Sequence, residues 1–143
     1  MHGPPLDITA RVVRLTDGRF THKGVMATGV QMDVGPTAVL EVEGANGGSV
    51  QVITTTYRMQ PTDLEMIRSQ GIEPTEQQIL VVKSSMHYRA AFTPIAMEII
   101  EVDGPGLTSP RFPGLTWHNL RRPMYPFDTD FEWTPQATII ERE

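Results

Sequence analysis

Five polar residues with complementary chemistry follow closely on one another in the second half of the chain. In the run KSSMHYR they are Lys83, Ser84, Ser85, His87 and Arg89. Two cations, two hydroxyls and an imidazole can bind a carboxylate or a phosphate, above all beside a helix N-terminus, where free N–H groups attract negative charge. These five are the candidate ligand-binding residues. The alternative is that Lys83 and Arg89 are merely solvated while His87 packs on a neighbouring strand.

The same residues do not predict a catalytic or a metal-binding site. A serine two residues from His87 points in a different direction on a helix, and no Gly-x-Ser-x-Gly sequence surrounds it, so the serines fit better as helix caps. The four histidines lie far apart, and none has a second ligand at helical spacing. Cysteine is absent, which excludes Cys-ligated zinc and a thiol nucleophile. We predict no catalytic residue, no metal ligand and no cofactor within this chain.

A strand-helix-strand unit is predicted to position the candidate residues. Residues 79–83 and 98–102 are typical of short apolar strands. Between them an apolar stripe recurs at helical spacing, at Tyr88, Ala91, Phe92, Ile95 and Ala96. Pro94 interrupts this stripe, so it predicts either a kink or a second short turn capped by Thr93. The candidate residues then follow the end of the first strand, where ligands commonly bind in α/β sheets.

The N-terminal half predicts antiparallel strands. Residues 7–16 alternate in polarity before the turn dipeptide Asp17-Gly18, which indicates a hairpin. Residues 36–42 and 50–56 are rich in β-branched side chains and flank a turn of glycine and asparagine. Thr62 then fits the cap of a helix over residues 63–70. The predicted fold class is α/β with a mixed sheet: antiparallel strands in the N-terminal half, followed by a β-α-β unit.

Domain organisation is predicted as one α/β domain over residues 1–110 and an irregular tail over 111–143. The tail is rich in aromatic residues and prolines without a helical or strand period, so it cannot form a core of its own. Its aromatic side chains are expected to pack on the domain or on a partner, and residues 138–140 could add an edge strand. Arg121 and Arg122 could bind an acidic group, although paired arginines more often form surface ion pairs.

Composition argues against two classes of partner. A net charge of −5 and a pI near 5.3 offer no broad basic surface for nucleic acid or an anionic membrane. No apolar run approaches the roughly 18 residues of a membrane span, and the first residues lack the pattern of a signal peptide. We therefore expect a cytoplasmic protein that binds neither nucleic acid nor membranes.

Several stretches of the sequence resemble a known family. They are residues 14–30 (RLTDGRFTHKGVMATGV), 32–42 (MDVGPTAVLEV), 60–110 with the run KSSMHYRAAFTPIAMEIIEVDGPG, and 120–128 (LRRPMYPFD). In these stretches, which cover most of the chain, it resembles the C-terminal domain of the MlrC family, the microcystin-degradation proteins classed as zinc-dependent metallopeptidases.

The resemblance implies a partner domain. In the family an N-terminal metallohydrolase domain holds the zinc and cleaves peptide or amide bonds. The chain would then be an accessory C-terminal domain that helps to shape the substrate cleft and is inactive alone. It is expected to be either a piece of a longer protein or a homologue that keeps this module only. Two alternatives stay open: a stand-alone binding module for an acidic ligand or a protein partner, and a domain that forms a homo-oligomer.

Overall fold

The chain folds into two compact units. This computed structural model describes residues 5–44, 46–104, 111–132 and 134. The larger unit, Pro5–Ile100, is called the core unit below. The smaller unit, of which residues 101–104, 111–132 and 134 are described, is called the tail unit. None of the helices in these described ranges has the length and apolar character that crossing a lipid bilayer demands.

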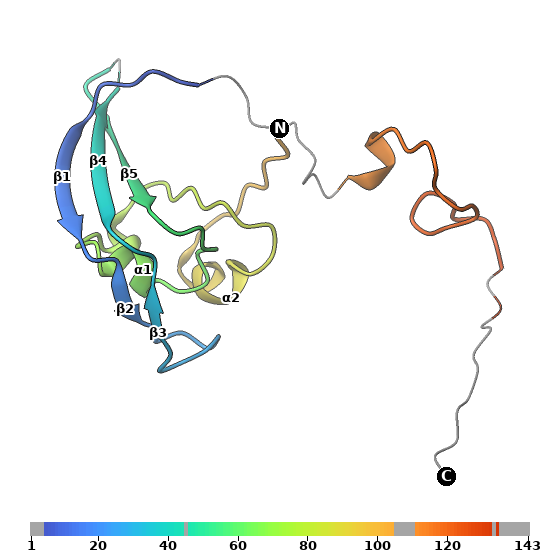
Figure 1. Cartoon of the computed structure of the whole chain (residues 1–143), viewed down its shortest axis with the longest axis horizontal. Helices are drawn as coiled ribbons and strands as arrows, with labels where there is room; N and C mark the ends of the chain where they lie inside the picture. Colours follow the sequence, from blue (N-terminus) through green and yellow to red (C-terminus); the bar gives the residue numbers. More distant parts are fainter. Residues whose placement is uncertain (1–4, 45, 105–110, 133, 135–143) are drawn as a thin grey trace, which may run out of the picture. The chain divides into compact units, whose positions relative to one another are not determined.

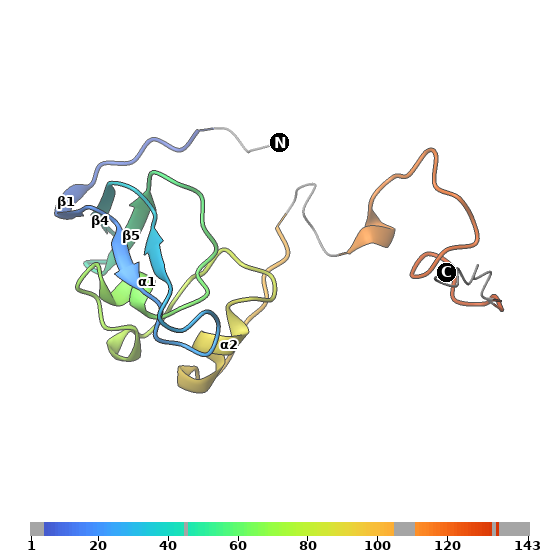
Figure 2. The same ribbon diagram turned by 60° about the horizontal axis from the view of Figure 1, so that its bottom comes forward.

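A three-stranded antiparallel sheet forms the largest element of the core unit. Its middle strand, β4 (Thr37–Glu43), lies between β1 (Arg11–Thr16) and β5 (Ser49–Thr55), as Figures 1 and 2 show. β4 and β5 pair along their whole length, and the Gly44 N–H donates to the Gly48 carbonyl at 2.7 Å in the turn between them. The predicted antiparallel strands of the N-terminal half are confirmed. They could be predicted because β-branched side chains favour strands, and a glycine-rich turn favours a hairpin, through interactions between residues close in sequence.

A second sheet consists of β2 (Arg19–Thr21) and β3 (Gln31–Asp33). The predicted turn at Gly18 is present with φ of +74°, and a Cβ there would lie 2.0 Å from the Gly35 carbonyl oxygen, so only glycine fits. The strands on either side of this turn do not pair with each other: β1 joins β4, and β2 joins β3. The predicted hairpin is therefore wrong, since a turn is set locally while strand pairing also depends on distant segments.

Two single-turn helices supply the buried centre of the core unit. They are α1 (Glu65–Arg68) and α2 (Arg89–Phe92), with a 3-10 turn, η1 (Pro74–Glu76), between them in the chain. Their buried cluster consists of Ile67, Tyr88 and Phe92. Ile53 of β5 packs against it, so sheet and helices share one core. The other partly buried side chains on this cluster are Leu64, Ile72, Leu80, Val82, Ala91 and Ile99.

Of the predicted strand-helix-strand unit, the helix is present and the strands are not. Residues 79–83 and 98–102 pair with no strand in the described part of the chain. Leu80 and Val82 nevertheless pack on the core while Ile79 and Val81 are exposed, the alternation of an extended chain. A strand forms only where a neighbour shares its backbone hydrogen bonds. The α/β class, with strands preceding the helices, is confirmed.

Pro94 divides the central helix. α2 ends at Phe92, and a separate 3-10 turn, η2 (Thr93–Ile95), follows with the proline in its first turn. Proline has no N–H to donate to the carbonyl one turn earlier, so the α-helix cannot continue through it. The second of the two predicted outcomes is thus the one observed, with Phe92 instead of Thr93 at the cap position.

Side-chain contacts order the described part of the tail unit. It contains a 3-10 turn, η3 (Phe112–Gly114), and the Trp117 Nε1–H donates to the Phe112 carbonyl at 2.8 Å. The indole ring meets Phe127 edge-on, with ring centres 5.7 Å apart. Aromatic packing therefore occurs within this unit itself. The edge strand predicted at residues 138–140 falls outside the described residues.

The carboxylate of Asp63 joins the loop after β2 to the start of α1. Its Oδ2 accepts hydrogen bonds from the N–H groups of Lys23 at 3.0 Å and Gly24 at 2.6 Å, and its Oδ1 accepts one from Glu65 at 2.8 Å. Burial of this side chain raises the pKa of the carboxyl, but the three N–H donors outweigh burial and hold the pKa of Asp63 below its usual value. Asp63, and not the predicted Thr62, therefore accepts a hydrogen bond from the free N–H group of the first residue of α1.

Replacing Asp63 with alanine is expected to lower the free energy of unfolding by about 2 kcal/mol, because several backbone N–H groups lose their acceptor at once. Urea denaturation monitored by circular dichroism measures this change. Asp7 is exposed and makes no hydrogen bond or ion pair with a described residue. Asp7→Ala is therefore the matched control, with an expected change within about 0.5 kcal/mol.

The Asp63→Ala effect should also depend on pH. A carboxyl whose pKa is depressed by folding stabilises the folded state above its unfolded pKa of about 3.9, and this contribution is lost as the pH falls through the folded value. The difference in unfolding free energy between wild type and Asp63→Ala should therefore shrink in acid. A difference that stays constant between about pH 7 and pH 3 contradicts a stabilising carboxylate.

Candidate functional site

Two of the five candidate residues, Ser84 and His87, contact the side chain of Gln60, a residue outside the five that lies in the loop after β5. His87 Nδ1 lies 2.7 Å from Gln60 Oε1, and the Ser84 hydroxyl donates to the same oxygen at 3.4 Å. Because the amide oxygen is an acceptor, His87 carries its hydrogen on Nδ1 and leaves Nε2 as an acceptor in the neutral form. Sequence analysis did not single out Gln60, since its partners lie 24 and 27 residues further along the chain.

The other three candidates, Lys83, Ser85 and Arg89, belong to the same segment, residues 83–89. Lys83 and Ser85 are exposed and make no hydrogen bond or ion pair with a described residue. The Arg89 guanidinium lies over the ring of Tyr88, 5.5 Å from its centre, which is a cation–π arrangement. Tyr88 belongs to the buried cluster, so this polar segment is attached directly to the core.

The helix N-terminus contributes little to the attraction of an anion here. α2 has four residues, so its peptide dipoles add over a single turn only. The cap position belongs to Tyr88, whose side chain makes no capping hydrogen bond, and neither Ser84 nor Ser85 caps the helix as the sequence suggested. The positive charge of this segment therefore comes from the side chains of Lys83 and Arg89.

A buried acid–imidazole pair, which sequence analysis missed, connects His22, in the loop between β2 and β3, with Asp63, just before α1. His22 Nδ1 is 3.8 Å from Asp63 Oδ2 and 3.0 Å from the carbonyl oxygen of Met26, to which it donates. Phe20 stacks on the imidazole with ring centres 5.6 Å apart. These contacts close the loop onto the core. The one available signal was the acidic residue at the start of the predicted helix over residues 63–70.

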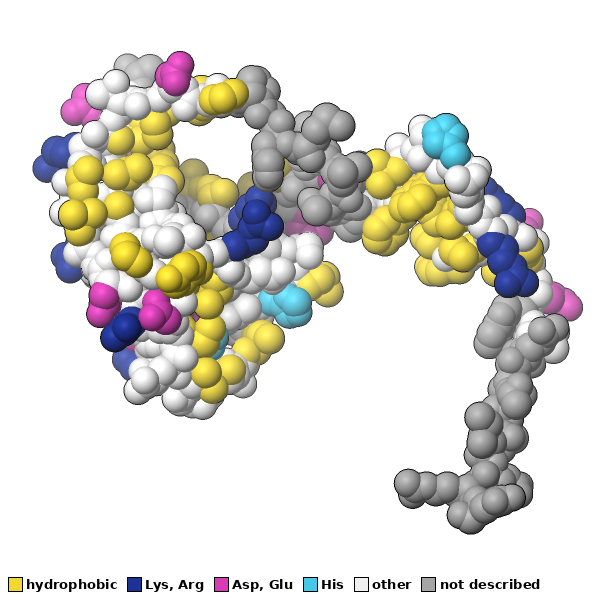
Figure 3. All heavy atoms as spheres, in the orientation of Figure 1, with side chains coloured by type: hydrophobic (Ala, Val, Ile, Leu, Met, Phe, Trp, Pro, Cys, Tyr) yellow, Lys and Arg dark blue, Asp and Glu magenta, His cyan; other side chains and the backbone are white. Residues whose placement is uncertain are grey.

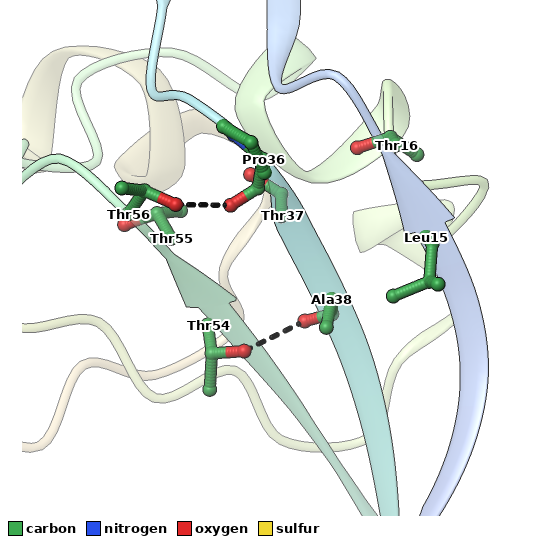
Figure 4. A pocket seen from close by; sticks show the side chains of 8 residues that line it. All are labelled: Leu15, Thr16, Pro36, Thr37, Ala38, Thr54, Thr55 and Thr56. Carbon is green, nitrogen blue, oxygen red and sulfur yellow. Dashed lines mark hydrogen bonds between the residues drawn. The ribbon is translucent and has the colours of Figure 1, made fainter.

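A hollow on the core unit lies over the sheet and is not lined by any of the five candidate residues. It measures about 330 Å³ and is lined by Leu15, Thr16, Pro36, Thr37, Ala38, Thr54, Thr55 and Thr56. Four of its hydroxyls donate to backbone carbonyls, and Figure 4 shows two of these bonds, from Thr54 to Ala38 at 3.1 Å and from Thr56 to Pro36 at 2.6 Å. Since these hydroxyl hydrogens are already used in hydrogen bonds to the backbone, the hollow offers few donors to a ligand.

In the tail unit, the sequence LRRPMYPFD forms a loop closed by an ion pair. The Arg122 guanidinium donates to both carboxylate oxygens of Asp128, and the Met124 N–H donates to Oδ2 at 2.8 Å. These bonds, first of all those from Arg122, lower the pKa of Asp128 to about 2. Arg122 thus forms the predicted surface ion pair, while Arg121 is exposed and contacts no acidic group among the described residues.

Comparisons with known proteins agree on one family. The family described as MlrC C-terminus matches residues 1–119. Microcystinase C of Sphingomonas sp. is 25% identical over 126 residues, which cover 88% of this chain and 22% of that protein. A crystal structure of a Mesorhizobium sp. BNC1 protein described as a metallopeptidase has a TM-score of 0.64 and 32% identity, covering 87% of this chain and 24% of that chain. The chain therefore spans about a quarter of the length of these relatives.

The ion pair of the tail loop predicts an unusually acidic carboxyl. In an NMR titration, the Asp128 side-chain carbonyl shift should move only near pH 2, because protonation must break the bonds from Arg122 and Met124. Arg122→Gln should raise the pKa of Asp128 toward about 3.9, the value for an unpaired aspartate. The Asp130 carboxylate, which bonds to no described residue, gives a control signal that Arg122→Gln should leave unchanged. An unchanged Asp128 titration in Arg122→Gln would rule out the ion pair as the cause.

Proposed function

Because the chain belongs to the MlrC C-terminus family, we propose that it is the accessory C-terminal domain of a zinc-dependent peptidase or amide hydrolase. In this proposal it packs on the metallohydrolase domain of the same polypeptide and forms one wall of the substrate cleft. It does not catalyse hydrolysis alone. Support comes from the family match, from the metallopeptidase and microcystinase names of its relatives, and from the quarter of their length that the chain spans.

The described residues do not fit a zinc site. His22 donates its Nδ1 hydrogen to Met26, and both oxygens of Asp63 accept backbone N–H groups, so this pair has no common face of free ligand atoms. No group of three or more histidine, aspartate or glutamate side chains is placed to hold a metal in the described ranges. In this proposal the zinc would be held by the metallohydrolase domain.

The cleft contribution rests on one observation, the polar segment that carries Lys83, Ser84, Ser85, His87 and Arg89. This segment presents positive charge and hydrogen-bond donors at the surface, while Tyr88 and Phe92 hold its far end in the core. Hydrogen bonds to Gln60 already restrict the side chains of His87 and Ser84, so these side chains would lose less conformational freedom on binding a ligand. Such a segment suits the carboxylates and backbone carbonyls of a peptide.

A second candidate function, a stand-alone binding module for an acidic ligand, uses the same segment. Its supporting observation is that Lys83 and Ser85 are exposed without a partner among the described residues. The two proposals differ in what the 143-residue chain does alone. Titration of the chain with acetate, glutarate and phosphate should shift the amide signals near Ser84 only if the binding module is correct.

The cleft proposal predicts slower hydrolysis by variants of this segment. In the polypeptide that carries both domains, Lys83→Ala, His87→Ala and Arg89→Ala should each lower kcat/KM for peptide hydrolysis by about tenfold, or about 1.4 kcal/mol of transition-state stabilisation. Zinc content should stay unchanged in all three. Arg19→Ala on β2, which removes an exposed ion pair with Asp33 of β3, is the matched control and should leave kcat/KM intact. Unchanged kinetics in all three segment variants would remove this segment from the cleft.

A further inference from the structure

Two segments of the core unit have the side-chain pattern of strands but no backbone partner. Among the described residues, no backbone group of Ile79, Leu80, Val81 or Lys83 forms a hydrogen bond with another backbone group, and the same holds for residues 97–100. The inward side chains Leu80, Val82 and Ile99 nevertheless pack on the buried cluster. Among the described residues, side chains hold these segments against the core, and only the Val82 carbonyl, which accepts the Ser84 N–H at 3.1 Å, has a backbone partner.

The outward side chains of these segments are apolar. Ile79 is 82% exposed, Val81 92%, Met97 105% and Ile100 77%. A single exposed apolar residue is ordinary, but a segment that alternates an inward and an outward apolar row is typical of a strand covered on both faces. Burying each outward valine or isoleucine would remove a large apolar side chain from water, which favours a covering partner.

The edge strand β1 of the three-stranded sheet carries charged residues that oppose pairing with another chain, and residues 79–82 do not. β1 exposes Val12, Val13 and Leu15, but Arg11 and Arg14 alternate with them, and Figure 3 shows hydrophobic and basic side chains side by side over this strand. Charged residues on an edge strand oppose pairing with other chains. The run Ile79-Leu80-Val81-Val82 contains no charge, proline or glycine. An unprotected apolar edge is expected where a partner is always present.

Resting on the function proposed above, we propose that residues 79–83 form a strand that pairs through its backbone with a strand of the metallohydrolase domain of the same polypeptide. Ile79 and Val81 then pack on apolar side chains of that domain. A partner in the same polypeptide fits the lengths, because relatives are about four times as long as the matched region. It also fits the location, because Lys83 ends this strand and Ser84 follows it, so the pairing would bring the candidate ligand-binding residues next to the metallohydrolase domain.

Hydrogen–deuterium exchange tests the pairing. The amides of residues 79–83 should exchange freely in the 143-residue chain alone and at least about a hundredfold more slowly in the two-domain polypeptide, since paired strand amides exchange only on opening. The amides of β4 and β5 should be protected equally in both. Fast exchange at residues 79–83 in the two-domain polypeptide overturns the proposal. Protection in the chain alone that grows with its concentration also overturns it, because the occupant is then a second copy.

A matched pair of variants separates side-chain packing from general surface effects. Val81→Asp and Val25→Asp each place a carboxylate at a residue that is more than four-fifths exposed, at 92% and 83% respectively. In the two-domain polypeptide, Val81→Asp should abolish the protection of residues 79–83, and Val25→Asp should not. Equal protection in both variants contradicts a buried Val81. The kinetics of the Lys83, His87 and Arg89 variants test the cleft independently, so either proposal can fail while the other stands.

Discussion

The buried carboxylate of Asp63 is the contact on which the arrangement of the core unit depends. Through backbone N–H groups on two sides it fixes the loop after β2 and the first turn of α1 in one position. α1 then places Ile67 against Tyr88 and Phe92, and that cluster holds α2 and the polar segment before it. A single side chain thus links the smaller sheet to the candidate site, although no atom of Asp63 belongs to that site.

Sequence reasoning succeeded where the determining chemistry is local. The β-branched runs around the turn at residues 44–48 predicted β4 and β5, and Gly18 marked a turn that only glycine allows. It failed where the partner lies far along the chain. Nothing near Asp63 indicates that its acceptors serve Lys23 and Gly24, 40 and 39 residues away, and the turn at Gly18 does not reveal that β1 pairs with β4.

The candidate site shows the same division. The spacing of polar residues from Lys83 to Arg89 is visible in the sequence, and the apolar stripe through Tyr88 and Phe92 correctly marks their anchor in the core. The interruption at Pro94 was also predictable, because a proline cannot continue the backbone hydrogen bonding of a helix, and α2 ends at Phe92 with a separate 3-10 turn after it. Gln60 could not be predicted, since its role arises only when the loop after β5 meets His87.

Residues 79–83 carry the most informative disagreement between sequence pattern and fold. Their composition and inward packing are those of a buried strand, yet the described chain supplies no neighbour for their backbone. Backbone N–H and C=O groups flanked by apolar side chains on both faces gain stability only when pairing and burial occur together. The proposed pairing with the metallohydrolase domain would supply both at once, and this accounts for the apolar pattern. Since Lys83 ends that segment, the proposed pairing would also fix the position of the candidate ligand-binding residues that follow it.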